Sequence, residues 1–248
     1  MTRHLIPLSA LLAVIHALNP SCAPGGNFDL SPFNLQLPIG NPGSPTTIPA
    51  SQLVGCSGYQ DPGHHYFFTE SGDGALVMKV PGSPSATGCV TTPNSQHCRT
   101  ELREAHPSNS WDPNAARNRL LVGLAVPVAD NSQHGTVIGQ IHIDDSVSSK
   151  PVCELFYNSA GVVSLGVEQT RAGGNEIVQQ VGTVTPGSVF SYEIRYEGGA
   201  LSVGLNGGEQ KTFGTYSLNS PKSYFKVGNY NQGSSASDVH FFSIAVEH

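Results

Sequence analysis

The chain has 248 residues, of which 28 are glycine, 18 are proline and only 12% are charged. So few charges exclude an architecture of long helices that expose Glu–Lys pairs, and the glycines and prolines indicate frequent turns. The formal net charge of −6 argues against nucleic acid as a partner, because phosphate binding requires a basic surface. An acidic protein can still bind an anionic polysaccharide where several cations share one cleft.

The first residues are typical of a secretory signal peptide. A short polar start precedes a mostly apolar segment over residues 5–18, and Ala17 and Ala23 are candidate cleavage positions. A buried core helix is the alternative, but the prolines and glycines that follow favour a removed peptide. We therefore expect a secreted protein whose signal peptide occupies approximately residues 1–23. No later stretch approaches the length of a transmembrane helix, so no membrane partner is expected.

The rest of the chain has the pattern of a succession of short strands. Residues 28–49 are rich in Pro, Gly, Ser and Thr and are expected to run along the surface. Residues 81–94 are predicted as a loop, and residues 114–118 are the only helical candidate. Runs with strand-like alternation lie at 66–69, 75–80, 99–103, 119–127, 137–144, 152–158, 162–170, 176–184, 189–197, 200–205, 210–213, 224–230 and 239–246. This spacing predicts an all-β sandwich or barrel, and with no linker after residue 60 we expect one domain over residues 24–248.

The five cysteines agree with an oxidising compartment. Cys22 lies at the predicted signal boundary, which leaves an even number with three alternative pairings: Cys56, Cys89, Cys98 and Cys153. We favour Cys89–Cys98, which would staple a Gly/Pro/Asn-rich loop, together with Cys56–Cys153. Metal binding is the rival interpretation, but the sequence contains no Cys-x-x-Cys pair.

Three of the predicted strands carry polar side chains at alternate positions. These are Arg99, Glu101 and Arg103, then Gln140, His142 and Asp144, and finally Lys226 and Tyr230. Side chains at i, i+2 and i+4 of a strand point to one face, so Leu102, Ile141 and Val227 are expected on the opposite, buried face. The polar faces hold the groups needed to bind an anion and to move protons.

This set of side chains suits the β-elimination of a uronate polysaccharide. Arg103 can pair with the substrate carboxylate through two hydrogen bonds, and the Gln140 amide can donate to the developing enolate. His142 is a candidate base for the C5 proton, since its ordinary pKa lies near neutrality. Tyr230 can return a proton to the departing O4, or act as the base if neighbouring cations acidify its phenol.

Other interpretations of the same residue types are weaker. A single polar residue on a strand is most often solvated surface, and only the repetition over three strands indicates a site. His64 and His65 beside Asp61 could hold a metal, but a polar turn is favoured. Asp144–Asp145 lacks a second cluster at ligand spacing, so neither metal nor cofactor is expected. Glu101 and Glu104 face opposite sides of a strand, which excludes a glycosidase carboxylate pair.

Three blocks of the sequence resemble the signature blocks of polysaccharide lyase family seven, the alginate lyases. They are residues 99–104 (RTELRE), 140–142 (QIH) and 224–232 (YFKVGNYNQ), in the same order and at similar spacing. The resemblance extends from about Phe28 to the C-terminus. It implies a concanavalin-like jelly-roll β-sandwich with a concave substrate groove. It also implies an enzyme that binds alginate and cleaves it to 4,5-unsaturated products, and we expect this enzyme to be a monomer.

The resemblance assigns a role to each position of the blocks. Arg103 and Gln140 would neutralise the carboxylate, and His142 and Tyr230 would move the protons. The remaining expected substrate-binding residues would line the groove or hold the catalytic groups in place: Arg99, Glu101, Lys226, Tyr224 and Asn231. In mannuronate the C5 proton and O4 are syn, so Tyr230 could be both base and acid, whereas the anti arrangement in guluronate suits His142 as base.

One hint about the substrate and one departure from the family pattern accompany this assignment. Family members with Ile at the position of Ile141 are often associated with guluronate, which is a weak hint about the substrate, and Val227 stands where the family often has Ala. A lyase for another polyuronate such as glucuronan is one alternative. A non-catalytic, lectin-like binding module on the same sandwich is the other. The pairing of His142 with Tyr230 argues against a binding module, which has no use for a proton donor and acceptor.

Overall fold

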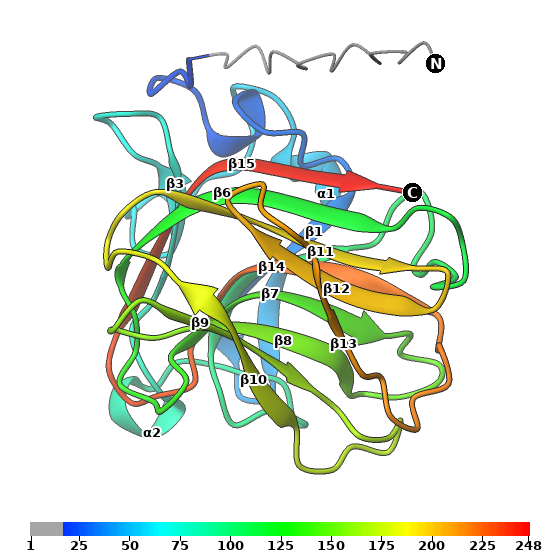
Figure 1. Cartoon of the computed structure of the whole chain (residues 1–248). Helices are drawn as coiled ribbons and strands as arrows, with labels where there is room; N and C mark the ends of the chain where they lie inside the picture. The colour runs from blue at the N-terminus through cyan, green and yellow to red at the C-terminus, as the bar shows by residue number, and fades with distance from the viewer. Residues whose placement is uncertain (1–16) are drawn as a thin grey trace, which may run out of the picture.

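The computed structural model describes residues 17–248, and residues 1–16, which include most of the predicted signal segment, lie outside this range. Two antiparallel sheets pack face to face as a jelly-roll β-sandwich, which confirms the predicted all-β fold (Figure 1). The eight-stranded sheet has the order β10 (Ile177–Thr183), β9 (Val162–Val167), β8 (Pro151–Tyr157), β7 (Thr136–Ile143), β14 (Ser223–Tyr230), β5 (Arg99–Glu104), β1 (Phe33–Asn41) and β2 (Ser44–Ile48). The seven-stranded sheet has the order β13 (Lys211–Phe213), β12 (Ala200–Leu205), β11 (Phe190–Glu197), β6 (Arg119–Val128), β15 (Ser237–Glu247), β4 (Leu76–Val80) and β3 (Phe67–Thr69).

Helical structure is confined to three single turns in the described range. They are a 3₁₀ turn at Pro24–Gly26, α1 (Ala50–Leu53) and α2 (Pro84–Thr87). α2 interrupts the predicted 81–94 loop, and residues 114–118, the predicted helical candidate, are a turn instead. None of the helices in residues 17–248 has the length and apolar character needed to cross a membrane.

The core lies between the two sheets and is built by strand alternation. Leu102, Ile141 and Val227 have no exposed surface, as their positions in the polar strands predict. They belong to the same apolar cluster as Val122 and Ile194 of the facing sheet. Burying a side chain of this size contributes roughly 2 kcal/mol, so each polar strand is anchored by its inner face.

The prediction of a surface segment over residues 28–49 is wrong. This region forms β1 and β2, and β1 pairs with β5 in antiparallel register. Phe33, Leu35 and Leu37 alternate along β1 and are at most 1% exposed. Their period of two is a strand signal, but the surrounding Pro, Gly, Ser and Thr residues masked it.

The disulfide pairing is partly as expected. Cys89–Cys98 is confirmed, but Cys56 bonds to Cys22 and not to Cys153. Cys153 is a free thiol on β8 with no exposed surface, and its side chain belongs to the core between the sheets. Cys56 follows α1 near the N-terminal 3₁₀ turn, where Cys22 is its neighbour. Cys22 is therefore part of the folded domain.

Candidate active site

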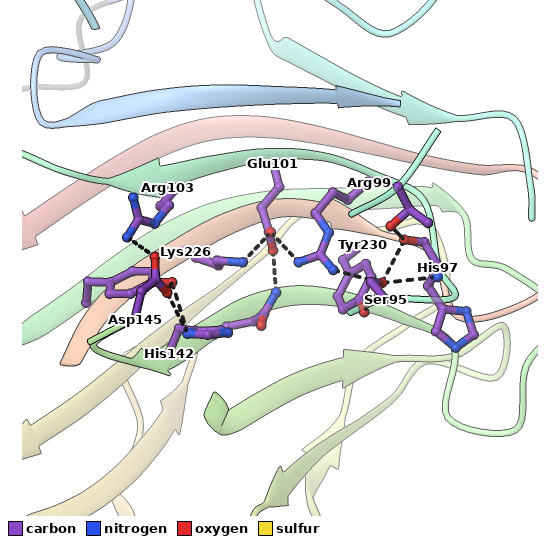
Figure 2. Close-up of polar contacts among 12 residues, drawn as sticks. Ser95, His97, Arg99, Glu101, Arg103, His142, Asp145, Lys226 and Tyr230 are labelled. Atoms are coloured by element: carbon purple, nitrogen blue, oxygen red, sulfur yellow. Dashed lines mark hydrogen bonds and ion pairs between the residues drawn. The ribbon is translucent and has the colours of Figure 1, made fainter. Parts of the chain in front are cut away.

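The outer face of the eight-stranded sheet carries a cleft of about 580 Å³. β14 lies between β5 and β7, and its register places Lys226 opposite both Arg103 and Gln140, and Tyr224 opposite His142. Eight of the nine predicted site residues gather here, and seven of them line the cleft: Arg99, Arg103, Gln140, His142, Tyr224, Lys226 and Tyr230. Figure 2 shows five of these side chains, those of Arg99, Arg103, His142, Lys226 and Tyr230, converging from three strands that are distant in sequence.

A buried ion cluster lies at the centre of the site, below the cleft. The carboxylate of Glu101 pairs with Arg99 Nη1 at 3.2 Å and with Lys226 Nζ at 3.3 Å, and its side chain is 3% exposed. Burial raises the pKa of Glu101, but the two cations outweigh it and the pKa is lowered. Glu101 is therefore ionised and holds both cations in place, since an unpaired buried charge would be costly.

Gly228 lets β14 approach β5 beside this cluster. It lies opposite Glu101, and a Cβ atom at this position would be 2.5 Å from the Thr100 carbonyl oxygen and 2.7 Å from Glu101 Cα. No other residue fits that gap without moving a strand.

Gln140 is oriented by the same carboxylate. Its Nε2 donates a hydrogen bond to Glu101, which fixes the direction of the amide. An amide nitrogen carries two hydrogens, so one remains for a ligand in the cleft. This geometry suits the predicted role of Gln140 as a donor to a carboxylate or enolate.

Arg103 forms the rim of the cleft together with a residue that the sequence analysis did not select. Its guanidinium lies 4.3 Å from the ring centroid of Tyr224, and its Nη2 donates to Asp145 at 2.7 Å. Tyr224 Oη also donates to Asp145, at 2.8 Å. The predicted strand partner, Asp144, instead lies in the turn after β7, where its carboxylate accepts hydrogen bonds from the Ser146 hydroxyl and backbone N–H. Alternation ends with the strand, so it could not indicate Asp145.

His142 is a neutral side chain with one free ring nitrogen. Burial, followed by the nearby Lys226, lowers its pKa to about 3. Its Nδ1 lies 2.9 Å from the Ile143 carbonyl oxygen and 2.9 Å from Tyr224 Oη. A carbonyl only accepts and the Tyr224 hydrogen is given to Asp145, so Nδ1 carries the hydrogen and Nε2 has the lone pair of a base.

Tyr230 is a protonated phenol held against a cation. The Arg99 guanidinium carbon lies 3.6 Å from its ring centroid, and Ser95 Oγ lies 3.0 Å from its Oη. Burial raises the pKa of Tyr230 and Arg99 opposes this shift, but the pKa stays above the ordinary value. The phenol therefore retains its proton at neutral pH and can act as an acid.

One end of the cleft is acidic. Glu154, Glu168 and Glu176 line it together with Lys150. Burial raises the pKa of Glu154 against the opposing charge of Arg99, and burial together with repulsion from Glu154 and Glu168 raises the pKa of Glu176. The sequence analysis did not find these residues, because Glu154 lies on β8, Glu168 follows β9 and Glu176 precedes β10, and only the pairing of these strands brings them together.

Asn231 does not line the cleft. Its Nδ2 donates to the Ser235 carbonyl and to Ser237 Oγ, and its Oδ1 accepts from the Gly233 N–H. It is 1% exposed and holds the turn between β14 and β15. The expectation that Asn231 lines the groove is therefore not met, because the end of β14 turns its side chain into the fold, and its other expected role, holding neighbouring groups in place, stays a prediction.

The metal-like clusters in the sequence have structural explanations. The Asp61 carboxylate accepts hydrogen bonds from the backbone N–H groups of Gly63, His65 and Tyr66, so this cluster is the expected polar turn. Within residues 17–248, no group of three or more His, Cys, Asp or Glu side chains is placed to hold a metal ion.

Comparisons with known proteins agree with this arrangement. The family described as alginate lyase matches residues 28–248. The crystal structure of alginate lyase A1-II', a member of polysaccharide lyase family 7, superposes with a TM-score of 0.75 at 28% identity, over 91% of this chain and 98% of that chain. A variant of A1-II' in complex with a substrate described as GGMG gives a TM-score of 0.76 at 27% identity, over 92% and 97% of the two chains. Alginate lyase PA1167 from Pseudomonas aeruginosa gives 0.71 at 28% identity, over 89% and 99%. A comparison with curated protein sequences gave no significant match.

Proposed function

Because the chain belongs to the alginate lyase family, we propose that it cleaves the 4-linked uronate chains of alginate by β-elimination. The observation that carries this proposal is the pair of His142 and Tyr230. One has a bare ring nitrogen and the other retains its proton, and both line the same cleft as Arg103 and Gln140. A binding module would need the cations but not this acid and base.

The reaction begins with neutralisation of the carboxylate attached to C5. Arg103 supplies a charge-assisted pair and Gln140 supplies its free N–H, which together stabilise the negative charge that develops on the carboxylate oxygens. Each such donor is worth roughly 3 kcal/mol in the transition state. The C5 proton becomes acidic enough for a protein base to remove.

Elimination follows with no water consumed. The C5–H bond breaks, its electron pair forms the C4=C5 double bond, and the C4–O4 bond breaks. O4 takes a proton from Tyr230 and leaves as the hydroxyl of the shorter chain. In guluronate the proton and O4 lie on opposite faces, so His142 Nε2 acts as the base. In mannuronate they lie on one face, so the ionised fraction of Tyr230 serves both steps: its own proton passes to bulk water, the phenolate takes the C5 proton, and the phenol then returns that proton to O4.

The anionic substrate itself makes His142 a better base. In the free site, burial and the cations Lys226, Arg99 and Arg103 disfavour the imidazolium. A bound carboxylate offsets these cations and raises the pKa of His142 toward the range useful for catalysis.

We further propose that the enzyme is a secreted monomer and that it cleaves bonds in the interior of the polysaccharide (endo cleavage). The cleft is lined from Gln36 on β1 to Glu176 before β10, which gives room for several sugar units. Two disulfides support an oxidising compartment, and Cys22 in the fold requires that a signal peptide be cleaved before this residue, as at Ala17.

The test is the ultraviolet absorbance of the unsaturated product, measured with polymannuronate, polyguluronate and glucuronan in separate reactions. A rise with either alginate polymer supports the proposal, and a rise with glucuronan alone would reassign the substrate. A flat trace on all three with retained binding would reject the lyase in favour of a lectin-like module. Early products of mixed length support endo cleavage, whereas release of single sugar units would contradict it.

A further inference from the structure

Ser95 meets the phenol of Tyr230 at the wall of the cleft (Figure 2). It lies on the loop closed by the Cys89–Cys98 disulfide, and its Oγ is 3.0 Å from Tyr230 Oη. Ser95 is partly buried and lines the cleft, so the contact lies where a substrate oxygen would receive its proton. The reaction proposed above assigns no role to this serine.

The hydrogen bonds of Ser95 determine which oxygen donates. A hydroxyl group has one hydrogen and two acceptor lone pairs. Both lone pairs are engaged, because Arg99 Nη2 and the His97 backbone N–H each donate to Ser95 Oγ at 3.1 Å. Tyr230 therefore has no lone pair on Ser95 to which it can donate. The one Ser95 hydrogen has two acceptors in reach: the His97 carbonyl at 3.1 Å, which also accepts from Thr91 Oγ1, and the Tyr230 phenol oxygen at 3.0 Å. The phenol is the better acceptor for it, because otherwise the Ser95 and Tyr230 oxygens would lie 3.0 Å apart with no hydrogen between them.

We propose that Ser95 is a positioning residue for the proton transfers of Tyr230. It donates its hydrogen to the phenol oxygen, so that the phenol's own hydrogen points into the cleft toward the glycosidic oxygen. During elimination the Tyr230 proton moves to O4, and Ser95 keeps its hydrogen and stabilises the phenolate that remains. This inference rests on the proposed lyase function.

Burial and other charged groups near this phenol also affect its pKa, in addition to Ser95. Arg99 from β5 lies on the ring, and His97 from the loop is 6.1 Å away between ring centroids. Glu154 from β8 and Glu101 from β5 raise the pKa of Tyr230, whereas Arg99 and Ser95 lower it. Loss of the serine hydroxyl should therefore move the ionisation of this phenol to higher pH.

The test compares three substitutions of Ser95 in the full-length protein. Ser95→Ala removes the hydroxyl, whereas Ser95→Thr and Ser95→Val have nearly the same shape and differ in whether a hydroxyl is present. Ser85→Ala, an exposed serine on α2, is the control that changes a neighbouring segment without touching Tyr230. For each protein, kcat and KM are measured across pH with alginate polymers, and thermal unfolding checks the fold.

Ser95→Ala and Ser95→Val should lower kcat by at least about tenfold with KM changed by less than about threefold. The limb of the kcat–pH profile that Tyr230 controls should move to higher pH, and Ser95→Thr should retain both the rate and the profile. A normal kcat with an unmoved profile in Ser95→Val would overturn the proposal. So would a change confined to KM, which would make Ser95 a binding residue only.

A second measurement reads the contact without turnover. Ultraviolet titration of the parent, minus that of Tyr230→Phe, isolates the ionisation of the Tyr230 phenol. The same difference in the Ser95→Ala background should lie at higher pH, and an unchanged titration would reject the hydrogen bond. A parent protein that cleaves no polyuronate would reject the proposed function while this titration still decides the contact.

Discussion

The carboxylate of Asp145 accepts a hydrogen bond from Arg103 at 2.7 Å, so the cation proposed to clamp the substrate is already paired. The side chain of Asp145 is 60% exposed and that of Arg103 is 32% exposed. A pair as open as this one contributes at most about 1 kcal/mol. A substrate carboxylate can therefore displace Asp145, but it must compete with it.

Asp145→Asn should lower KM by roughly two- to fivefold, because the competing charge is removed while an amide oxygen can still accept from Tyr224. We expect kcat to stay within about twofold of the parent. Steady-state kinetics at low ionic strength measures both values. Glu209→Gln, at an exposed position, controls for the change in net charge. A higher KM in Asp145→Asn alone would mean that Asp145 helps to bind the substrate.

The two proposed elimination routes predict a substrate-dependent effect of His142→Ala. On polyguluronate kcat should fall by at least about a hundredfold, because a base is needed on the face opposite Tyr230. On polymannuronate the loss should be smaller, since Tyr230 serves both steps. Tyr230→Phe should lower kcat on both polymers. Equal losses with His142→Ala on the two polymers would contradict separate routes.

Glu101→Gln should destabilise the fold more than an ordinary surface change. It leaves Arg99 and Lys226 buried without their shared anion, at a cost of about 3 kcal/mol in the free energy of unfolding. Urea denaturation measures the change. Glu247→Gln is the matched control, because its ion pair with Arg117 is exposed and should be worth less than about 0.5 kcal/mol. Similar losses for both variants would refute the assignment of Glu101 as a buried support.

The depressed pKa of His142 predicts a loss of stability in acid. Its value of about 3 in the folded protein lies below the ordinary value of 6.5. Between these values the unfolded chain binds a proton that the folded protein excludes, so stability falls as the pH decreases through this window. The melting temperature of His142→Gln should therefore decrease less than that of the parent when the pH is lowered from about 7 to about 4. His106→Gln, at an exposed histidine, should behave like the parent.

The position of Cys22 predicts the mature N-terminus. Protein recovered from a secreting host should begin before Cys22, and peptide mapping should show Cys22 linked to Cys56, Cys89 linked to Cys98, and Cys153 as a free thiol. Cys22→Ser should lower the free energy of unfolding by about 3 kcal/mol, because the lost bridge closes a long loop. A mature chain that starts after Cys22 would contradict this assignment.

Strand periodicity was sufficient to predict most of the site. Arg99, Gln140 and Lys226 share a face with the other polar residues because the period of a strand is two, and the buried partners confirm that phase. The prediction fails for β1 because composition and spacing disagree there. Phe33, Leu35 and Leu37 alternate as strand residues do, but the Pro, Gly, Ser and Thr residues around them predict a surface segment.

The rest of the site depends on contacts that have no local signal. Asp145 enters through the turn after β7, and Ser95 enters through a loop held by a disulfide. Glu154 and Glu176 become neighbours only because β8, β9 and β10 are adjacent in the sheet. Asn231 is the opposite case. It lies next to one of the signature blocks' catalytic residues, but its side chain forms hydrogen bonds that hold the turn after β14 and does not line the cleft.

The buried thiol of Cys153 also gives the protein an internal reporter. It has no exposed surface, and burial raises its pKa well above the ordinary value, so in the folded protein it is neither accessible nor a thiolate. The other four cysteines described between residues 17 and 248 are oxidised. A thiol-specific label therefore reacts only when β8 leaves the sandwich, and its rate of incorporation follows the opening of the sheet that carries the cleft.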